Sequence, residues 1–182
     1  MQLKTDNSYL EQKIKLRIDT INLVNKKNIH VLDCFAGKGL IWNEVKKQFP
    51  EHDIRILQIE KVKNKNKLAL QGDNLKVMKS LNLKQFDIID LDAYGIPYKQ
   101  LKEIFNQHYK GYVHVTAIQS GMGALPKDML KELGFTEEMY KKIKSIFNVN
   151  GVKKLENYLY LYGIESVTGF YIDRKSYFYF KT

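Results

Sequence analysis

The sequence predicts an α/β protein built on a mostly parallel β-sheet with helices on both faces. Strand-like and helix-like segments alternate along much of the chain, a glycine-containing loop follows the first strand, and the chain ends in two strand-like runs joined by two residues. Alternation indicates a parallel sheet, because each parallel connection needs a crossover that a helix usually supplies. So short a final link implies an antiparallel hairpin.

The composition describes a globular protein. A chain of 182 residues is long enough to bury its own core, so we expect a single domain covering residues 1–182. No apolar run approaches the length needed to span a membrane, and the start has no segment suited to secretion. The lone Cys34 cannot form an internal disulfide or a zinc site. We therefore expect a cytoplasmic protein with no membrane association and no metal.

The charge points to a polyanionic partner. Thirty basic residues stand against twenty acidic ones, which gives a net charge of +10 and makes nucleic acid the first candidate. All but three of the basic residues are lysines, which neutralise phosphate well but read base edges poorly. A biased genome composition would produce the same lysine excess, so that alternative stays open.

The first element is predicted to be a helix. Ser8 and Glu11 form the S-x-x-E pattern of a capping box. Apolar residues at helical spacing then mark the face expected to meet the core: Leu10, Ile14, Ile18 and Ile21.

Seven strand-like runs follow. Five of them alternate with helical patterns and should form the parallel part of the sheet: residues 29–35, 55–60, 67–71, 86–92 and 112–118. The closing hairpin is expected from residues 167–173 and 176–181. Three helices are expected between the fifth strand and this hairpin.

The loop after the first strand has the composition of a ligand-binding turn. Residues 31–39 read V-L-D-C-F-A-G-K-G, and Gly37 and Gly39 allow a close approach of the backbone to a ligand. A dinucleotide fingerprint requires a third glycine where Trp42 stands, and a P-loop requires a Ser or Thr after Lys38. Both phosphate-binding motifs are therefore disfavoured, while an ordinary strand-to-helix turn remains an alternative.

The pattern D-x-F-A-G-x-G resembles motif I of the class I S-adenosylmethionine (SAM) methyltransferases. This resemblance implies a Rossmann-like class I methyltransferase fold, with a seven-stranded, mostly parallel sheet and a C-terminal antiparallel hairpin. It also implies SAM as the cofactor and S-adenosylhomocysteine (SAH) as its product. The residues that it places near the methionine part of SAM are Asp33, Phe35, Ala36, Gly37 and Gly39.

Two further acids stand at the ends of predicted strands. In the family that the chain resembles, an acid at the position of Glu60 binds the ribose hydroxyls, and one at the position of Asp73 binds the adenine amino group. Their neighbours Lys61 and Asn74 are expected to contribute to the same pocket. For each acid alone, the alternative is a helix N-cap or a solvated turn.

The end of the fourth strand carries the most specific pattern. Residues 90–95 read D-L-D-A-Y-G, with Pro97 close behind, which resembles motif IV of methyltransferases that modify exocyclic amino groups. The closest version is D-x-D-P-[F/Y]-G-x-P of the tRNA guanine-N2 dimethyltransferases, in which a proline stands where this chain has Ala93. The V-T-A of residues 115–117 also resembles that family, although the next two residues depart from it.

This resemblance implies a SAM-dependent N-methyltransferase acting on an exocyclic amino nitrogen of a purine, with RNA, and tRNA in particular, favoured over DNA. Asp92 and Tyr94 are the expected catalytic residues, and Asp90 is an expected cofactor contact. The dimethyltransferases normally carry a further C-terminal domain, so a partner chain or a homodimer could complete substrate recognition. The alternatives are methylation of a small molecule or a protein amine, and a non-catalytic SAM-binding regulatory subunit.

Overall fold

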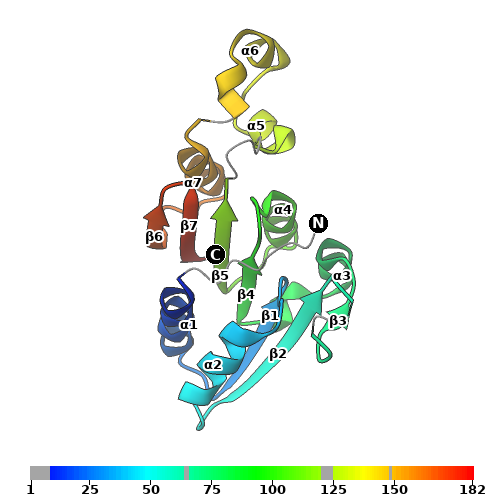
Figure 1. Ribbon diagram of the computed structural model, residues 1–182, viewed down its shortest axis with the longest axis vertical. Helices are drawn as coiled ribbons and strands as arrows, with labels where there is room; N and C mark the ends of the chain where they lie inside the picture. Colours follow the sequence, from blue (N-terminus) through cyan, green and yellow to red (C-terminus); the bar gives the residue numbers. More distant parts are fainter. Residues whose placement is uncertain (1–8, 64–65, 120–124, 148) are drawn as a thin grey trace.

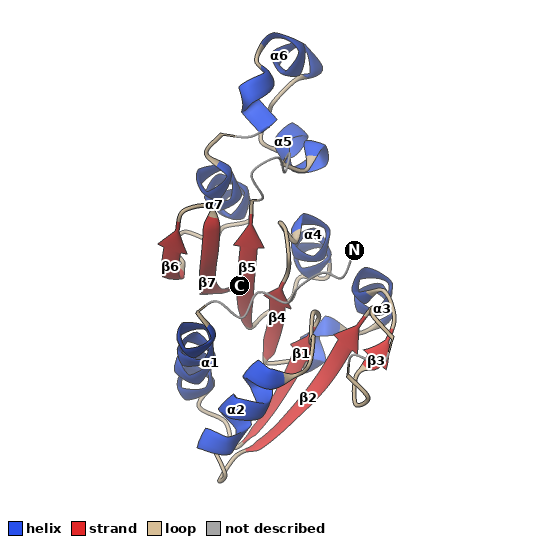
Figure 2. Ribbon diagram, in the orientation of Figure 1, coloured by secondary structure: helices blue, strands red, loops and turns tan. Residues whose placement is uncertain are grey.

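The computed structural model describes residues 9–63, 66–119, 125–147 and 149–182 and contains one seven-stranded sheet (Figures 1 and 2). The strand order is β3-β2-β1-β4-β5-β7-β6. The strands are β1 (Asn28–Asp33), β2 (Asp53–Glu60), β3 (Leu70–Gln71), β4 (Ile88–Asp92), β5 (Tyr112–Ile118), β6 (Thr168–Ile172) and β7 (Lys175–Lys181). The α-helices are α1 (Leu10–Val24), α2 (Leu40–Gln48), α3 (Asn74–Ser80), α4 (Tyr98–Asn106), α5 (Lys127–Glu132), α6 (Glu137–Lys142) and α7 (Gly151–Leu161), and short 3-10 helices are η1 (Leu83–Gln85) and η2 (Lys144–Phe147).

The strand directions confirm the predicted fold class. The strands β3, β2, β1, β4 and β5 are parallel to one another, and β7 runs antiparallel between β5 and β6. The predicted hairpin is therefore correct, and it extends the sheet next to β5. Helices cover both faces, since α1 and α2 pack on one side of the sheet and α4, α5 and α7 pack on the other.

The third strand is shorter than predicted. The pattern at residues 67–71 suggested a five-residue strand, but only Leu70 and Gln71 pair with β2. β3 is an edge strand with exposed side chains, and Leu68 just before it is 89% exposed. A strand with neither a second neighbour nor a buried face has little to stabilise a longer ladder.

The predicted core-facing side of α1 is only partly correct. Ser8 of the expected capping box lies outside the described residues, and the helix begins after Tyr9, which has a left-handed conformation and no side-chain cap. Among the predicted apolar residues, Ile21 is buried, while Leu10, Ile14 and Ile18 are half-buried. The face that meets the sheet also carries polar side chains: the buried residues of α1 are Lys13, Leu16, Arg17, Thr20 and Ile21.

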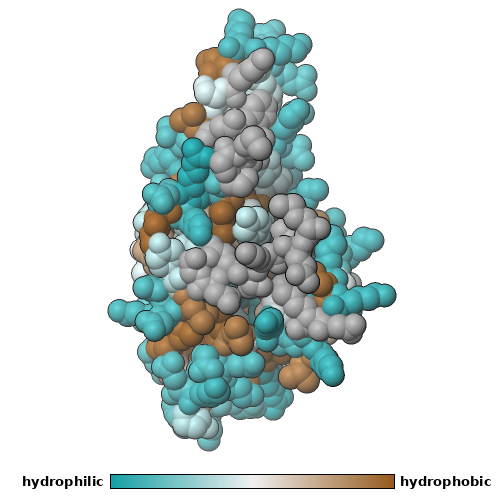
Figure 3. Space-filling view, in the orientation of Figure 1, coloured by the Kyte–Doolittle hydropathy of each residue, from teal (hydrophilic) through white to brown (hydrophobic). Residues whose placement is uncertain are grey.

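Helices α5 and α6, together with η2, form a lobe beyond the edge where the parallel strands end, while α7 packs on the sheet (Figure 1). Glu132 of α5 joins this lobe to the rest of the molecule, because it accepts hydrogen bonds from Tyr98 (2.6 Å) and Lys102 (2.6 Å) of α4 and from Tyr162 (2.9 Å). None of the α6 residues is buried, and this end of the molecule is mostly hydrophilic in Figure 3. Within the described residues, no helix is both long enough and apolar enough to cross a membrane.

Candidate active site at the ends of the central strands

Three carboxylates meet on one face of the central strands. Asp33 at the end of β1 pairs in register with Asp90 of β4, and Asp92 lies two residues further along β4. Because side chains two residues apart on a strand share a face, Asp90 and Asp92 both point to the side covered by α1. The structure therefore brings together three of the acids predicted from the sequence.

Asp90 is the most deeply buried of these acids. Arg17 of α1 donates to both of its oxygens, from Nε at 3.0 Å and from Nη2 at 2.7 Å, and Trp42 Nε1 donates at 2.8 Å. Asp90 and Arg17 are each 1% exposed. Burial lowers the pKa of Arg17, but the adjacent Asp90 outweighs it, so that pKa is raised overall. The sequence predicts a cofactor contact at Asp90, and in the structure this buried acid accepts three hydrogen bonds, from Arg17 and Trp42.

Asp92 lies nearer the surface, and Lys13 of α1 holds it. Lys13 Nζ lies 2.9 Å from one carboxylate oxygen of Asp92 and 3.1 Å from the other. The Lys13 side chain is 4% exposed and that of Asp92 is 18% exposed, so the acid is the open member of the pair. Lys13 Nζ also lies 5.3 Å from the centre of the Tyr177 ring. Asp92 can therefore be reached from solvent while its cation cannot.

Sequence reasoning missed Lys13 and Arg17. They lie four residues apart and so share one helix face, which makes them neighbours above β4. The sequence does hold a signal for them. Two cationic residues stand four positions apart in the same turns of α1 that carry its apolar residues. Apolar periodicity alone ranks such residues as solvent-facing, because unpaired cations are seldom buried.

Asp33 completes the cluster, and among the described residues no cation forms an ion pair with it. It is buried, and burial together with Asp90 and Asp92 raises its pKa well above the usual value. The backbone N–H of Phe35 donates to it at 3.3 Å, and Gln58 Nε2 lies 3.5 Å away. Three carboxylates and two cationic side chains meet here, so a positively charged ligand would be stabilised beside Asp33.

The glycine loop crosses the same edge of the sheet. Gly37 and Gly39 have φ values of 56° and 75°, which L-residues with a side chain rarely adopt. A Cβ atom on Gly39 would also lie 2.9 Å from Nε2 of Gln58. Both glycines are buried, and the side chains of Gln58 and Asn66 lie against Gly39, so the shape of this loop depends on the absence of side chains at the glycines. Phe35 is half-buried and Ala36 is buried beside it.

Glu60 connects the end of β2 to the glycine loop. One carboxylate oxygen accepts from the backbone N–H of Gly37 at 2.9 Å, and the other accepts from Val62 N–H at 2.8 Å. These contacts hold the Glu60 carboxylate against the glycine loop. The neighbouring Lys61 is exposed.

Asp73 and Asn74 lie at the start of α3. Asp73 is exposed and caps the helix by accepting from Lys76 N–H at 3.1 Å, which is the alternative role considered for it. Asn74 donates to the carbonyl of Cys34 at 2.8 Å and accepts from Gln100 at 2.8 Å. Asn74 thus ties α3 to the end of β1. The Cys34 thiol is buried, and burial raises its pKa well above the usual value, which keeps it in the neutral form.

The loop after Asp92 combines a buried turn with an exposed aromatic ring. Ala93 is buried, and its N–H donates to the carbonyl of Leu91 at 2.8 Å. Tyr94 is 64% exposed, and Gly95 has a φ of 128°. The Gly95 carbonyl accepts from Ile118 N–H at 3.1 Å, which anchors the loop to the end of β5. An exposed tyrosine is therefore fixed two residues from the accessible acid.

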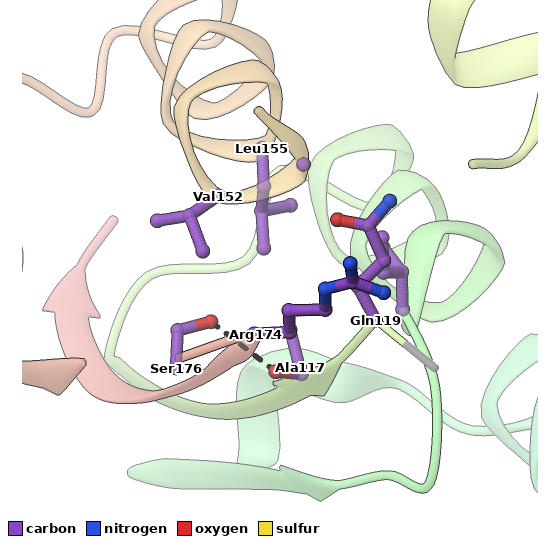
Figure 4. A pocket seen from close by; sticks show the side chains of 8 residues that line it. Ala117, Gln119, Val152, Leu155, Arg174 and Ser176 are labelled. Atoms are coloured by element: carbon purple, nitrogen blue, oxygen red, sulfur yellow. Dashed lines mark hydrogen bonds between the residues drawn. The ribbon is translucent and has the colours of Figure 1, made fainter. Parts of the chain in front are cut away.

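A small concavity lies near the end of β5, between β7 and α7 (Figure 4). Its volume of about 10 Å³ is enough for about one water molecule. It is therefore too small to hold a cofactor. Among the described residues, no group of three or more His, Cys, Asp or Glu side chains could hold a metal ion.

No family model matches the sequence, and a search of curated proteins also gives no match. Solved structures do match. A SAM-dependent methyltransferase from Archaeoglobus fulgidus is 13% identical with a TM-score of 0.54, and the match covers 93% of this chain and 92% of that one. The MNMC2 structure from Aquifex aeolicus is 15% identical with a TM-score of 0.55, covering 100% of this chain and 62% of that one. The DszA carbon methyltransferase is 11% identical with a TM-score of 0.58, covering 98% of this chain and 55% of that one.

At these low sequence identities the comparisons are evidence for the fold. The strand order and the antiparallel β7 agree with the architecture expected from the motif I resemblance. The chain has the fold of the class I SAM-dependent methyltransferases.

Proposed function

We propose that this chain is a SAM-dependent methyltransferase. The observation that carries the proposal is the buried Asp33, which lies beside Asp90 and Asp92; within the described part of the chain, two cations, Lys13 and Arg17, pair with acids of this cluster. SAM carries two cationic groups in its methionine part, a sulfonium and an ammonium. The negative charge of this acid cluster, next to the glycine loop, therefore matches the positive charge of these two groups of SAM.

The remaining residues of the pocket fit the neutral parts of SAM. The positive φ values of Gly37 and Gly39 turn the loop backbone along this edge of the sheet, and the Gly37 N–H holds Glu60 at the same edge. In this proposal Glu60 accepts from the ribose hydroxyls, and Asp73 and Asn74 lie toward the adenine. Asp90 supports the site from below by fixing Arg17 and Trp42.

We further propose that the acceptor is an exocyclic amino group of a purine. SAM supplies an electrophilic methyl group when it is bound. Asp92 accepts a hydrogen bond from the amino group, which orients its nitrogen and stabilises the positive charge that develops there during transfer. Aligning the reacting atoms is the largest catalytic contribution open to the protein, on the order of 7–11 kcal/mol at best.

Tyr94 has the exposure that a base-stacking residue needs. A base that leaves its pair or stack costs a few kcal/mol, and stacking on an aromatic ring returns about 1–3 kcal/mol. The tyrosine therefore offsets part of the cost of presenting the base to Asp92. The resemblance of residues 90–97 to motif IV supports a guanine-N2 target, and Ala93 in place of the family's proline makes the loop shape a feature of this chain.

The net charge of +10 supports nucleic acid as the substrate class, with tRNA as the favoured polymer. The fold alone does not decide the acceptor, because one of the matching structures is a carbon methyltransferase. The acceptor assignment therefore rests on Asp92, Tyr94 and the charge.

The test is transfer of a tritiated methyl group from SAM to purified total tRNA, rRNA and DNA, followed by nucleoside analysis. We expect label in a purine nucleoside methylated on its exocyclic nitrogen. Label in none of the three pools would overturn the nucleic-acid assignment. Thermal shift with SAH tests the cofactor separately, since a ligand that binds the folded state must raise the unfolding temperature.

A further inference from the structure

We infer that Lys13 is a positioning residue that fixes Asp92 to receive a neutral amino group and disfavours the binding of a protonated amine at that position. This inference rests on the proposed function, because it concerns the acceptor side of the same site. It concerns a residue of α1, which lies 79 positions before Asp92 in the sequence.

The geometry of the pair restricts the carboxylate. Lys13 Nζ lies within 3.1 Å of both Asp92 oxygens, so rotation of the carboxylate would break one of the two contacts. The lysine is itself held, because it is 3% exposed and its ammonium lies over the Tyr177 ring. Arg17 Nη1 also donates to the Lys13 carbonyl at 3.1 Å, which links the backbone of α1 to the Arg17–Asp90 pair. Asp92 therefore keeps one orientation toward its exposed side.

The charges of the pair select the acceptor. Lys13 with Asp92 carries no net charge, and neither does Arg17 with Asp90. A protonated amine that approached Asp92 would find a carboxylate whose negative charge is already balanced by Lys13. The Lys13 ammonium, about 3 Å from that carboxylate, would also repel the amine. An aromatic amino group needs only an oxygen lone pair, and Asp92 can still offer one. The pair therefore favours a neutral amine over a cationic one.

The first experiment compares Lys13→Met with Lys13→Arg and with the control Lys15→Met. Lys15 is exposed on the same helix, so its replacement removes the same charge without touching Asp92. We expect Lys13→Met to lower kcat for methyl transfer to tRNA by up to about a hundredfold. The dissociation constant for SAH should stay within about twofold of the wild-type value. Lys13→Arg should recover part of kcat, and Lys15→Met should behave as the wild type.

Two results would overturn the inference. One is a kcat of Lys13→Met equal to that of Lys15→Met. The other is an equal loss of SAH binding and kcat, which would mean that Lys13 only maintains the fold. A wild-type protein that binds SAH yet labels no nucleic acid would instead overturn the proposed function, so the two failures are distinguishable.

The second experiment needs no turnover. Benzylamine, which is protonated at neutral pH, carries an aromatic ring and an ammonium group, and its binding to the SAH complex is followed by the NMR signals of Tyr94. We expect Lys13→Met to bind it roughly fivefold more tightly than the wild type, the scale of a partly exposed ion pair. The double variant Lys13→Met/Asp92→Asn should lose this gain. Equal affinity in all three proteins would show that Lys13 does not control the charge of the acceptor site.

Discussion

Arg17 of α1 and Asp90 of β4 form a buried pair joined by two hydrogen bonds of 3.0 and 2.7 Å, although they lie 73 positions apart in the sequence. The pair lies directly beneath the accessible Asp92. The N-terminal helix is therefore part of the candidate site as well as a cover for the sheet.

Replacing Arg17 by methionine should destabilise the protein strongly, because it leaves Asp90 buried without its cation. Loss of one partner of a buried pair costs about 3–5 kcal/mol of unfolding free energy. The measurement is urea denaturation followed by circular dichroism. The matched control is Arg55→Met, which breaks the exposed pair between Arg55 and Asp53 and should cost at most about 1 kcal/mol. Equal effects of the two variants would contradict a structural role for the Arg17–Asp90 pair.

Gly39→Ala should weaken SAH binding more than tenfold. The added Cβ would lie 2.9 Å from Gln58 Nε2 and displace the end of that side chain beside Asp33, and the backbone φ of 75° is strained for alanine. Isothermal titration calorimetry measures the effect. Gly134→Ala is the control, because Gly134 also has a positive φ (85°) but open space around it. The control should lose about 1–2 kcal/mol of stability and bind SAH normally. An unchanged affinity in Gly39→Ala would remove the loop from the cofactor site.

Asp92→Asn should lower kcat by about a hundredfold to a thousandfold while leaving SAH binding intact, because it weakens one preorganised acceptor of the amino group. Asparagine is a better choice than alanine, since its amide oxygen still accepts from the buried Lys13. Single-turnover methyl transfer measures the chemical step. Undiminished transfer by this variant would remove Asp92 from the reaction. No activity in either protein, with SAH bound by both, would favour a regulatory SAM-binding subunit.

His114 should make stability depend on pH. Burial, with Arg17 nearby, lowers its pKa well below the usual value. The unfolded chain then binds a proton that the folded chain does not, so the free energy of unfolding decreases as the pH falls below about 6.5. Denaturation curves measured between pH 7 and 5 give the free energy of unfolding. This free energy should decrease less in His114→Asn than in the wild type, by up to about 1.4 kcal/mol per pH unit. The control is His108→Asn at an exposed, left-handed position, where asparagine is well tolerated. Identical pH slopes for the wild type and His114→Asn would disprove the assignment.

The sequence predicted the central sheet well because its strands are buried and carry continuous apolar runs. Residues 112–118 match β5 in full, and the short link expected at Arg174 and Lys175 correctly indicated the hairpin, whose turn lies one residue earlier, at Asp173 and Arg174. β3 was harder to predict, since an edge strand of two residues depends on its partner β2 more than on its own side chains.

The candidate site was predictable only in part. The acids at the strand ends follow from the chain pattern, and the structure brings Asp33, Asp90 and Asp92 together. Their cations come from a helix far away in the sequence, and no local pattern reveals which lysine or arginine is buried. Pairing of this kind is a tertiary property, in which a charge is accepted in the interior only because an opposite charge meets it there.

The long separation between the paired charges has a consequence for biosynthesis. Lys13 and Arg17 leave the ribosome well before Asp90 and Asp92 do, so a nascent chain that ends before β4 carries α1 with two cations and no acids to receive them. Docking of α1 on the sheet should therefore wait until β4 has been synthesised. The site then assembles late, through contacts between residues that are far apart in the sequence.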